Sequence, residues 1–216
     1  MVIPAFNEAG AIGRVVLGAR AFGMVVVADD ASTDATASVA RDNGAEVVTL
    51  AQNGGYDRAL DAGARRAREL GCSAFITMDA DGQHDPALIP VFLERIRDGA
   101  DVVVGVRDRF QRVSEYAFAM FGRVLWNIRD PMCGMKCYRM SVYDDLGHFD
   151  CYGSVGTELA IHAARAGRAL ANVPILTRPR AGASRFGAGW RANKRIFRAL
   201  ARGLGRKHSS ARKVSG

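Results

Sequence analysis

Short apolar runs alternate with amphipathic stretches along the first half of the chain. The runs VIPAF, MVVVAD, EVVTLA, SAFITMD and DVVVGV have the length and composition of buried strands. The segments between them carry apolar residues at helical spacing, and the longest runs from about Tyr56 to Leu70. Strands that alternate with helices through short loops are typical of a parallel sheet covered by helices. The pattern therefore predicts an α/β fold with a mostly parallel central sheet and helices on both faces.

The second half of the chain has a less regular pattern. It predicts a helix in SEYAFAMFGRVLWNI, a turn at Asp130-Pro131, a strand in GMKCYR, a helix over about Val155–Ala166 and a strand in ALANVPIL. No linker interrupts these elements, so we expect one domain over residues 1–186, with halves over about 1–106 and 107–186. We expect a basic amphipathic helix over 187–207 and a disordered tail over 208–216.

The predicted C-terminal helix combines an apolar stripe with many positive charges. Trp190, Ile196, Phe197, Leu200 and Leu204 lie near helical spacing. Seven basic residues lie between and after them: Arg191, Lys194, Arg195, Arg198, Arg202, Arg206 and Lys207. This composition favours a helix that lies in a membrane interface, although a helix packed on the domain with a solvated basic face has the same pattern.

The net charge of +8 is unevenly distributed. All 22 acidic residues and 16 of the 30 Lys and Arg residues lie at or before Glu158, which gives this part a net charge of −6. The 58 residues after it carry 14 basic residues and no acidic residue. Such asymmetry indicates a polyanionic partner, and nucleic acid, an anionic membrane surface and phosphorylated substrates are the candidates.

Length and composition narrow the class of protein. The chain has 216 residues, of which 49% are apolar and 24% charged, as expected for a soluble α/β domain. No apolar run approaches the roughly 20 residues that span a bilayer, and no signal peptide is visible. The opening MVIPAF is short for a first strand, so we expect that strand to be clipped. Cys72, Cys133, Cys137 and Cys151 form no metal-binding or disulfide pattern, which predicts reduced cytosolic thiols.

The stretch MDADGQHDP, residues 78–86, is the strongest chemical signal. Asp79 and Asp81 follow an apolar strand directly, at the end where open α/β sheets bind their ligands. Two close carboxylates repel each other unless a cation lies between them, and hard oxygen ligands suit Mg²⁺ or Mn²⁺ with substrate phosphates. The motif therefore predicts a metal site that binds a diphosphate. The alternative is a polar turn in which Asp85 caps a helix that begins at Pro86.

Further polar segments follow the other predicted strands. IPAFNE follows the first strand, ADDASTDAT follows the second with Ser32 or Thr33 as a helix cap, and NGGYDRALDAG opens the third helix. DPMCGMKCYR and RPRAGASRFG lie in the second half. In this order the segments resemble the family 2 glycosyltransferases of the GT-A fold. They are most similar to the branch with dolichyl-phosphate mannose synthase and bacterial polyprenyl-phosphate glycosyltransferases.

The resemblance covers Val2 to about Arg206, with two departures from the family pattern. The usual DDGS reads DDAS here, and the usual G-x-S-K reads GASR at residues 182–185. The second departure replaces the compact ammonium of lysine by the planar guanidinium of arginine. The resemblance implies a nucleotide-binding half and an acceptor half within one GT-A domain.

The resemblance also implies a role for individual residues. The nucleotide-sugar would contact Pro4, Phe6, Asn7, Glu8, Asp29, Asp30, Asn53, Asp79 and Ala80. The metal ligands would be Asp79, Asp81 and Gln83, with His84 as a support for them. The acceptor phosphate would meet Arg107, Lys136, Ser184 and Arg185. The residues that carry the transfer would be Asp81, Arg107, Arg180 and Arg185.

Each of these assignments has a structural alternative. Asn7 and Glu8 are also typical of a helix cap, and Asp29-Asp30 of an ordinary strand-to-helix turn. Arg107 is also typical of a solvated surface charge, and Lys136 of a mixed structural and phosphate-binding role. Glu158 is a candidate base for a hydroxyl acceptor or, equally, a carboxylate at a helix N-terminus.

The resemblance implies an inverting hexosyltransferase that moves a sugar from a nucleoside diphosphate to a polyprenyl phosphate, with Mg²⁺ or Mn²⁺. We expect it to work in the cytoplasm, peripherally at the inner face of the membrane, on an anionic surface. The first alternative is a family 2 transferase that acts on a glycan or protein hydroxyl. The remote alternative is a basic nucleic-acid-binding domain, and we expect no nucleic-acid partner. The sequence leaves the sugar, the nucleobase and the oligomeric state open.

Overall fold

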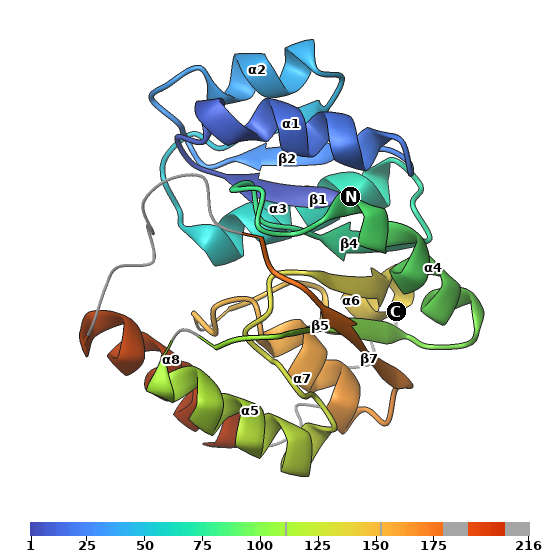
Figure 1. Cartoon of the computed structure of the whole chain (residues 1–216), viewed down its shortest axis with the longest axis vertical. Helices are drawn as coiled ribbons and strands as arrows, with labels where there is room; N and C mark the ends of the chain where they lie inside the picture. The colour runs from blue at the N-terminus through green and yellow to red at the C-terminus, as the bar shows by residue number, and fades with distance from the viewer. Residues whose placement is uncertain (111, 152, 179–189, 206–216) are drawn as a thin grey trace, which may run out of the picture.

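The computed structural model describes residues 1–110, 112–151, 153–178 and 190–205. In these residues seven strands form one sheet in the order β3-β2-β1-β4-β6-β5-β7 (Figure 1). Neighbouring strands are parallel except β6, which is antiparallel to β4 and β5. The strands are β1 (Val2–Ala5), β2 (Val26–Asp29), β3 (Glu46–Thr49), β4 (Ala74–Thr77), β5 (Val102–Arg107), β6 (Lys136–Arg139) and β7 (Leu170–Ile175). The predicted α/β fold with a mostly parallel sheet is confirmed.

Helices cover both faces of the sheet, as predicted. One core packs α1, α2 and α4 against residues such as Ile3, Val27 and Val103. The other packs α3, α5, α6, α7 and α8 against the opposite face. The helices are α1 (Ala9–Arg20), α2 (Thr36–Asp42), α3 (Tyr56–Glu69), η1 (Pro86–Leu88), α4 (Ile89–Arg97), α5 (Val113–Trp126), α6 (Met140–Leu146), α7 (Glu158–Arg165) and α8 (Trp190–Gly205).

The helix starts differ in part from the sequence prediction. Asp85 does cap the turn that begins at Pro86, because its carboxylate accepts a hydrogen bond from the Ala87 N–H at 3.0 Å. The prediction that Ser32 or Thr33 caps α2 is wrong, since Ala35 occupies that position. The backbone N–H of Thr36 is bound instead by Asp34 at 2.9 Å.

The C-terminal helix α8 packs on the domain through much of its predicted apolar stripe. Ile196 and Leu200 are buried in the core that α8 shares with α5 and α7. Asn193 also accepts a hydrogen bond from the Ser114 hydroxyl on α5 at 2.5 Å. Phe197 and Leu204 remain exposed. The helix therefore belongs to the fold of the domain, and its stripe is only partly available to a membrane.

The two predicted halves share one sheet. Strand β5, at the end of the first half, pairs with β6 and with β7, both of which belong to the second half. The boundary near residue 107 therefore separates two sides of a continuous sheet, and it stays a prediction as a functional division. In the described part of the chain, no helix has the length and apolar character needed to cross a membrane.

Candidate active site

The carboxyl ends of the parallel strands meet at one edge of the sheet. There β1 leads to Phe6, β2 to Asp30, β4 to Asp79 and β5 to Arg107. Because β6 runs antiparallel to β4, its first residue, Lys136, lies beside Thr77 at this same edge. The segment before β6 therefore also borders the crevice, which is where open α/β sheets bind ligands.

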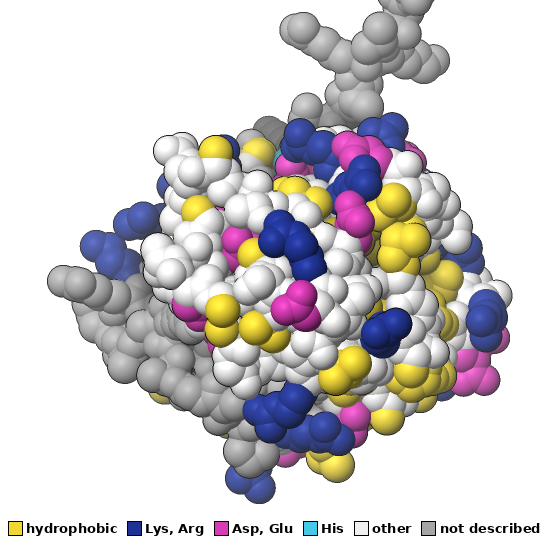
Figure 2. Space-filling view, turned by 90° about the horizontal axis from the view of Figure 1, so that it is seen from above, with side chains coloured by type: hydrophobic (Ala, Val, Ile, Leu, Met, Phe, Trp, Pro, Cys, Tyr) yellow, Lys and Arg dark blue, Asp and Glu magenta, His cyan; other side chains and the backbone are white. Residues whose placement is uncertain are grey.

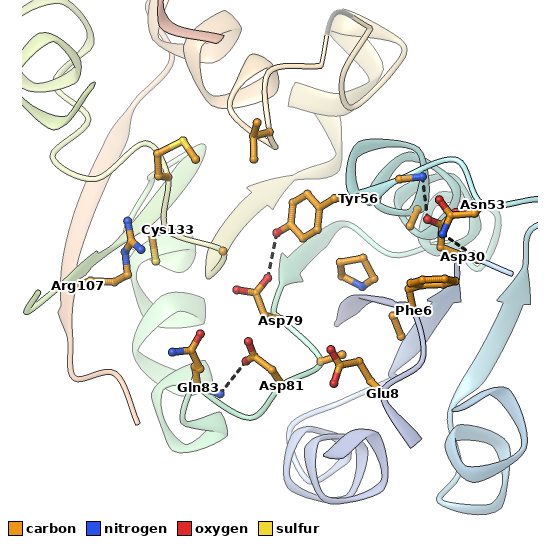
Figure 3. Close-up of a pocket in the computed structure, with 18 of the residues that line it drawn as sticks. Phe6, Glu8, Asp30, Asn53, Tyr56, Asp79, Asp81, Gln83, Arg107 and Cys133 are labelled. Carbon is orange, nitrogen blue, oxygen red and sulfur yellow. Dashed lines mark hydrogen bonds between the residues drawn. The ribbon is translucent and has the colours of Figure 1, made fainter. Parts of the chain in front are cut away.

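A cleft of about 690 Å³ opens at this edge. Figure 3 shows Phe6 and Arg107 on opposite sides of it, with Asp79 and Asp81 between them. Ten of the residues predicted for the site line the cleft: Pro4, Phe6, Glu8, Asp30, Asn53, Asp79, Ala80, Asp81, Gln83 and Arg107. The structure thus brings most of the predicted nucleotide residues, the three predicted metal ligands and one predicted acceptor residue, Arg107, into one cavity.

Asp79 is positioned by three neighbours. The phenol of Tyr56 donates a hydrogen bond to Asp79 Oδ1 at 3.1 Å, and the Asp79 N–H donates to His84 Nδ1 at 3.2 Å. Burial, with the charge and hydrogen bond of Asp79, raises the pKa of Tyr56 well above its ordinary value, so the phenol keeps its proton. Gly134 lies against this carboxylate so closely that an added Cβ would stand 2.3 Å from Asp79 Oδ2.

Asp81 is less exposed than Asp79. It is buried, and its Oδ1 accepts a hydrogen bond from the Gln83 N–H at 3.0 Å. Figure 3 shows the Gln83 side chain beside both carboxylates. The predicted metal ligands Asp79, Asp81 and Gln83 therefore face the same part of the cavity, and the buried His84 supports them through the backbone of Asp79.

Asp30 holds the glycine-rich loop that precedes α3. Its two carboxylate oxygens accept hydrogen bonds from the Gly54 and Gly55 N–H groups at 2.6 and 2.7 Å. The side-chain amide of Asn53 donates a hydrogen bond to the Asp30 carbonyl at 3.3 Å. Asp30 and Asn53 therefore lie next to each other in the wall of the cleft. Asp29 is buried behind them and does not line the cleft. The nucleotide role predicted for Asp29 therefore finds less support than that of Asp30.

Asn7 joins the loops that follow β1 and β2. Its side-chain oxygen accepts a hydrogen bond from the Thr33 N–H at 2.7 Å, and its own N–H donates to Ser32 Oγ at 2.8 Å. Asn7 and Ala31 both have positive φ, at 52° and 58°. Ala31 stands where the family pattern has glycine, so the departure from that pattern places a strained alanine beside the site. Asn7 supports the cleft without lining it.

Arg107 belongs to a buried network of charges. Its Nε lies 2.7 Å from Asp130 Oδ2, and its Nη2 lies 2.9 Å from Asp130 Oδ1 and 3.2 Å from Glu115. Arg112 pairs with Glu115 at 2.9 Å. Burial disfavours the charge, but the hydrogen bonds and charge of Asp130 raise the pKa of Arg107 above its ordinary value. Arg107 is therefore not a solvated surface charge.

Two predicted residues do not line the cleft. Lys136 is buried, its Nζ donates to the Gly156 carbonyl at 2.9 Å, and burial lowers its pKa. Glu158 accepts a hydrogen bond from the Cys151 N–H at 2.7 Å and starts α7. Neither residue lines the cleft. The geometry therefore gives no support to Lys136 as a phosphate ligand or to Glu158 as a base, and it favours the structural alternative for both.

Arg180, Ser184 and Arg185 lie outside the described residues, so their predicted roles stay predictions. The chain that leads to them is fixed beside the metal motif. The Arg178 N–H donates to the Gln83 carbonyl at 2.9 Å, and the Arg178 guanidinium pairs with Asp85. Arg178, the last described residue before this segment, therefore lies next to the loop that carries Asp81.

Several residues that line the cleft were missed by the sequence reasoning: Ala5, Gly55, Tyr56, Ala59, Arg112, Glu115, Met132, Cys133, Gly134 and Val155. Tyr56 and Gly134 lie in segments that were recognised as part of the site, but their contacts with Asp79 depend on the fold. Burial raises the pKa of Cys133 to about 12, so its thiol stays protonated and forms an uncharged part of the cavity wall. An alternation of apolar and polar residues gives no signal for such contacts.

The charges of the cleft fit a bound cation. The described lining residues include five carboxylates, namely Glu8, Asp30, Asp79, Asp81 and Glu115, and two cationic side chains, Arg107 and Arg112. A diphosphate would add further negative charge to this excess. Carboxylate and amide oxygens at Asp79, Asp81 and Gln83 form a hard donor set of the kind that suits Mg²⁺ or Mn²⁺.

The fold is that of the GT-A class, and comparisons with solved structures agree on this fold. Glucosyl-3-phosphoglycerate synthase from Mycobacterium tuberculosis, solved with Mg²⁺ and UDP, superposes with a TM-score of 0.77 over 96% of this chain and 79% of its own, at 22% identity. The same enzyme with Mn²⁺, UDP and phosphoglyceric acid superposes with a TM-score of 0.76 at 23% identity, over 96% and 78% of the two chains.

Comparisons of sequence give the family. Residues 1–147 match the model of glycosyl transferase family 2. A dolichyl-phosphate hexose transferase from Haloferax volcanii is 32% identical over 86% of this chain and 85% of its own length. An undecaprenyl-phosphate mannosyltransferase from Micrococcus luteus is 29% identical over 81% of each chain. The chain belongs to glycosyl transferase family 2 and is a glycosyltransferase, as the ordered motifs predicted.

Proposed function

We propose that this enzyme transfers a hexose from a nucleoside diphosphate to a polyprenyl phosphate, with inversion at the anomeric carbon. The observation that carries the proposal is a cleft that places the carboxylates of Asp79 and Asp81, which suit a divalent cation, opposite a buried arginine network. The two named relatives, which carry the names of a dolichyl-phosphate and an undecaprenyl-phosphate transferase, support the lipid phosphate as the acceptor.

The donor binds on the side built by β1, β2 and β4. Phe6, Asp30 and Asn53 form the wall for the nucleoside, and the diphosphate lies toward Asp79 and Asp81. Asp79, Asp81 and Gln83 would hold a divalent cation, which would supply positive charge for the departing diphosphate. The neutral Tyr56 phenol keeps Asp79 in position without adding charge.

The acceptor phosphate binds on the side of Arg107 and Arg112. Asp130 and Glu115 fix the Arg107 fork from behind, and among the described residues no acceptor contacts its Nη1. The Nη1 donors of a guanidinium held in this way are suited to a phosphate oxygen. Arg180, Ser184 and Arg185 would complete the phosphate contacts on the segment that follows Arg178.

The transfer itself needs little proton chemistry. A phosphate monoester has a second pKa near 6, so the acceptor is mostly dianionic at neutral pH and attacks as an oxyanion. Its oxygen bonds to the anomeric carbon as the bond from that carbon to the diphosphate breaks, and the configuration inverts. Glu158, the candidate base for a hydroxyl acceptor, does not line the cleft.

The acceptor also places the enzyme at a membrane. A polyprenyl chain resides in the bilayer, so the cleft must reach the surface of the membrane to meet the phosphate. We therefore propose peripheral association with the cytoplasmic face of an anionic membrane, with no part for nucleic acid. The exposed basic residues of α8, among them Lys194, Arg198 and Arg202, are consistent with such a surface.

A thermal-shift screen tests the donor side of the proposal. GDP-, UDP- and dTDP-sugars would each be added to the protein with Mn²⁺, and again with excess EDTA. One nucleotide class should raise the melting temperature, and EDTA should remove most of that shift. A shift that is equal with and without the metal would contradict the metal site, and no shift with any sugar nucleotide would contradict the donor.

A further inference from the structure

Helix α5 is apolar on the side that faces away from the core. Phe118 and Trp126 pack inward, while Val113, Tyr116, Met120 and Val124 are between 59% and 78% exposed. These four residues follow one another at helical spacing and form a row along the helix, which we call the α5 row. A helix that is apolar on both sides is normally covered, and an exposed row of this size marks an interaction surface.

The exposed charges on α5 and on its neighbour α8 have one sign. Arg123 is exposed on α5, and the single carboxylate of that helix, Glu115, is buried toward the cleft. The neighbouring helix α8 contains no acidic residue and exposes Lys194, Arg198 and Arg202. Figure 1 shows α5 and α8 side by side at the end of the molecule opposite α1 and α2. An apolar row flanked by positive charge complements an anionic bilayer.

The end of the molecule formed by α1 and α2 has a different distribution of charge. Figure 2 views that end and shows Lys and Arg side chains interspersed with Asp and Glu, with hydrophobic side chains among them. Leu17 on α1 and Met24 before β2 are each 51% exposed there. The two ends therefore have exposed apolar residues, but only the α5–α8 end combines a continuous row with a surface free of exposed carboxylates on its two described helices.

The first turn of α5 is also part of the active site. Arg112, which precedes the helix, and Glu115 both line the cleft. A surface that receives the α5 row would therefore lie next to the side of the cleft that is proposed for the acceptor phosphate. A second copy of the chain fits this row less well, because a symmetric contact would bring the basic residues of the two copies together.

We propose that the α5 row, flanked by the basic residues of α8, lies on the surface of an anionic phospholipid bilayer and holds the acceptor side of the cleft against it. The role that we give this contact rests on the proposed function, but the contact itself can be measured without enzyme turnover. It also shifts the main apolar contact with the membrane from α8, whose Ile196 and Leu200 are buried, to α5.

The test compares two double variants with the same change of charge. Met120→Asp with Val124→Asp alters the α5 row, and Leu17→Asp with Met24→Asp alters the opposite end. Both pairs replace exposed side chains, so both proteins should keep the wild-type melting temperature and nucleotide binding. Each would be sedimented with vesicles of phosphatidylglycerol and phosphatidylcholine that contain no polyprenyl phosphate. We expect the α5 variant to bind at least tenfold more weakly than wild type, and the control to stay within twofold.

Three outcomes would overturn the proposal. They are wild-type binding by the α5 variant, an equal loss in both variants, and a wild-type dimer that the α5 variant converts to a monomer without a change in vesicle binding. Measurements of turnover distinguish the proposed membrane contact from the proposed function. The α5 variant should lose activity on polyprenyl phosphate in vesicles but retain it on a water-soluble short-chain analogue. If no lipid phosphate is a substrate for wild type, the proposed function fails while the vesicle result still decides the contact.

Discussion

The two sides of the cleft hold their carboxylates by different means. On the acceptor side Asp130 and Glu115 are buried against Arg107 at 2.7 and 3.2 Å, so charge is balanced within the protein. On the donor side Asp30 is held by two backbone N–H groups and Asp79 by the neutral Tyr56 phenol. The acceptor side is thus organised before a substrate arrives, whereas the donor side retains negative charge that a divalent cation would complement.

Removing one carboxylate from the donor side should have the largest effect. We expect Asp81→Asn to lower kcat/KM by about 10³-fold, because the diphosphate would lose much of its charge compensation as it departs. Steady-state turnover with Mn²⁺ measures this loss. Asp98→Asn is the matched control, since the Asp98 side chain is 58% exposed at the end of α4 and does not line the cleft. Full turnover by Asp81→Asn would refute the metal assignment.

Crowding the other carboxylate of the pair, Asp79, should have the next largest effect. In Gly134→Ala the new Cβ would stand 2.3 Å from Asp79 Oδ2, so the carboxylate must move. We expect roughly a 100-fold loss of activity, as a displacement of about 1 Å produces in other sites. Weaker Mn²⁺-dependent nucleotide binding should accompany it. Gly10→Ala is the control, because nothing lies within 4 Å of its Cβ. Unchanged nucleotide binding by Gly134→Ala would show that Asp79 is not a ligand of the metal.

A change on the acceptor side should affect one substrate more than the other. Arg107→Lys keeps the positive charge but loses the planar fork that contacts Asp130 through two nitrogens. We expect the KM for polyprenyl phosphate to rise about tenfold, while the KM for the sugar nucleotide changes little. Arg109→Lys is the control, since Arg109 is 88% exposed. Equal increases in both KM values would show that Arg107 serves the diphosphate, and the division between the two sides would fail.

The smallest expected effect concerns the backbone of the donor side. Ala31→Gly should raise the free energy of unfolding by about 1 kcal/mol, because glycine adopts the positive φ of 58° without the steric strain of a Cβ. Denaturant unfolding measures the change. Ala62→Gly in the middle of α3 should shift stability the other way, since glycine weakens a helix interior. A loss of stability in Ala31→Gly would show that the loop after β2 is not strained.

Much of the fold was predictable because its elements depend on local pattern. Each apolar run of the first half became a strand, and the helix predicted over Tyr56–Leu70 spans Tyr56–Glu69. The short helix α6 was missed, as was the antiparallel direction of β6. A strand has the same alternation in either direction, so only the pairing of β6 with β4 and β5 determines how Cys133 and Gly134 reach the cleft.

The site was predictable where residues follow strand ends and less so elsewhere. Asp79, Asp81 and Arg107 come directly after parallel strands, and the edge of the sheet brings them together. Lys136 lies in a recognised motif, yet the fold turns its ammonium toward the carbonyl of Gly156, about 20 residues along the chain. Contacts of this range depend on tertiary packing, which a single sequence does not encode in its local pattern.

The dependence of transfer on the acceptor phosphate tests the account most directly. Wild-type enzyme, Mn²⁺ and the sugar nucleotide selected by thermal shift would be incubated with undecaprenyl phosphate or with undecaprenol, and the lipid products would be separated. We predict a glycosylated lipid from the phosphate, none from the alcohol, and loss of the product in excess EDTA. Glycosylation of undecaprenol, or undiminished transfer to the phosphate in EDTA, would contradict the proposed reaction.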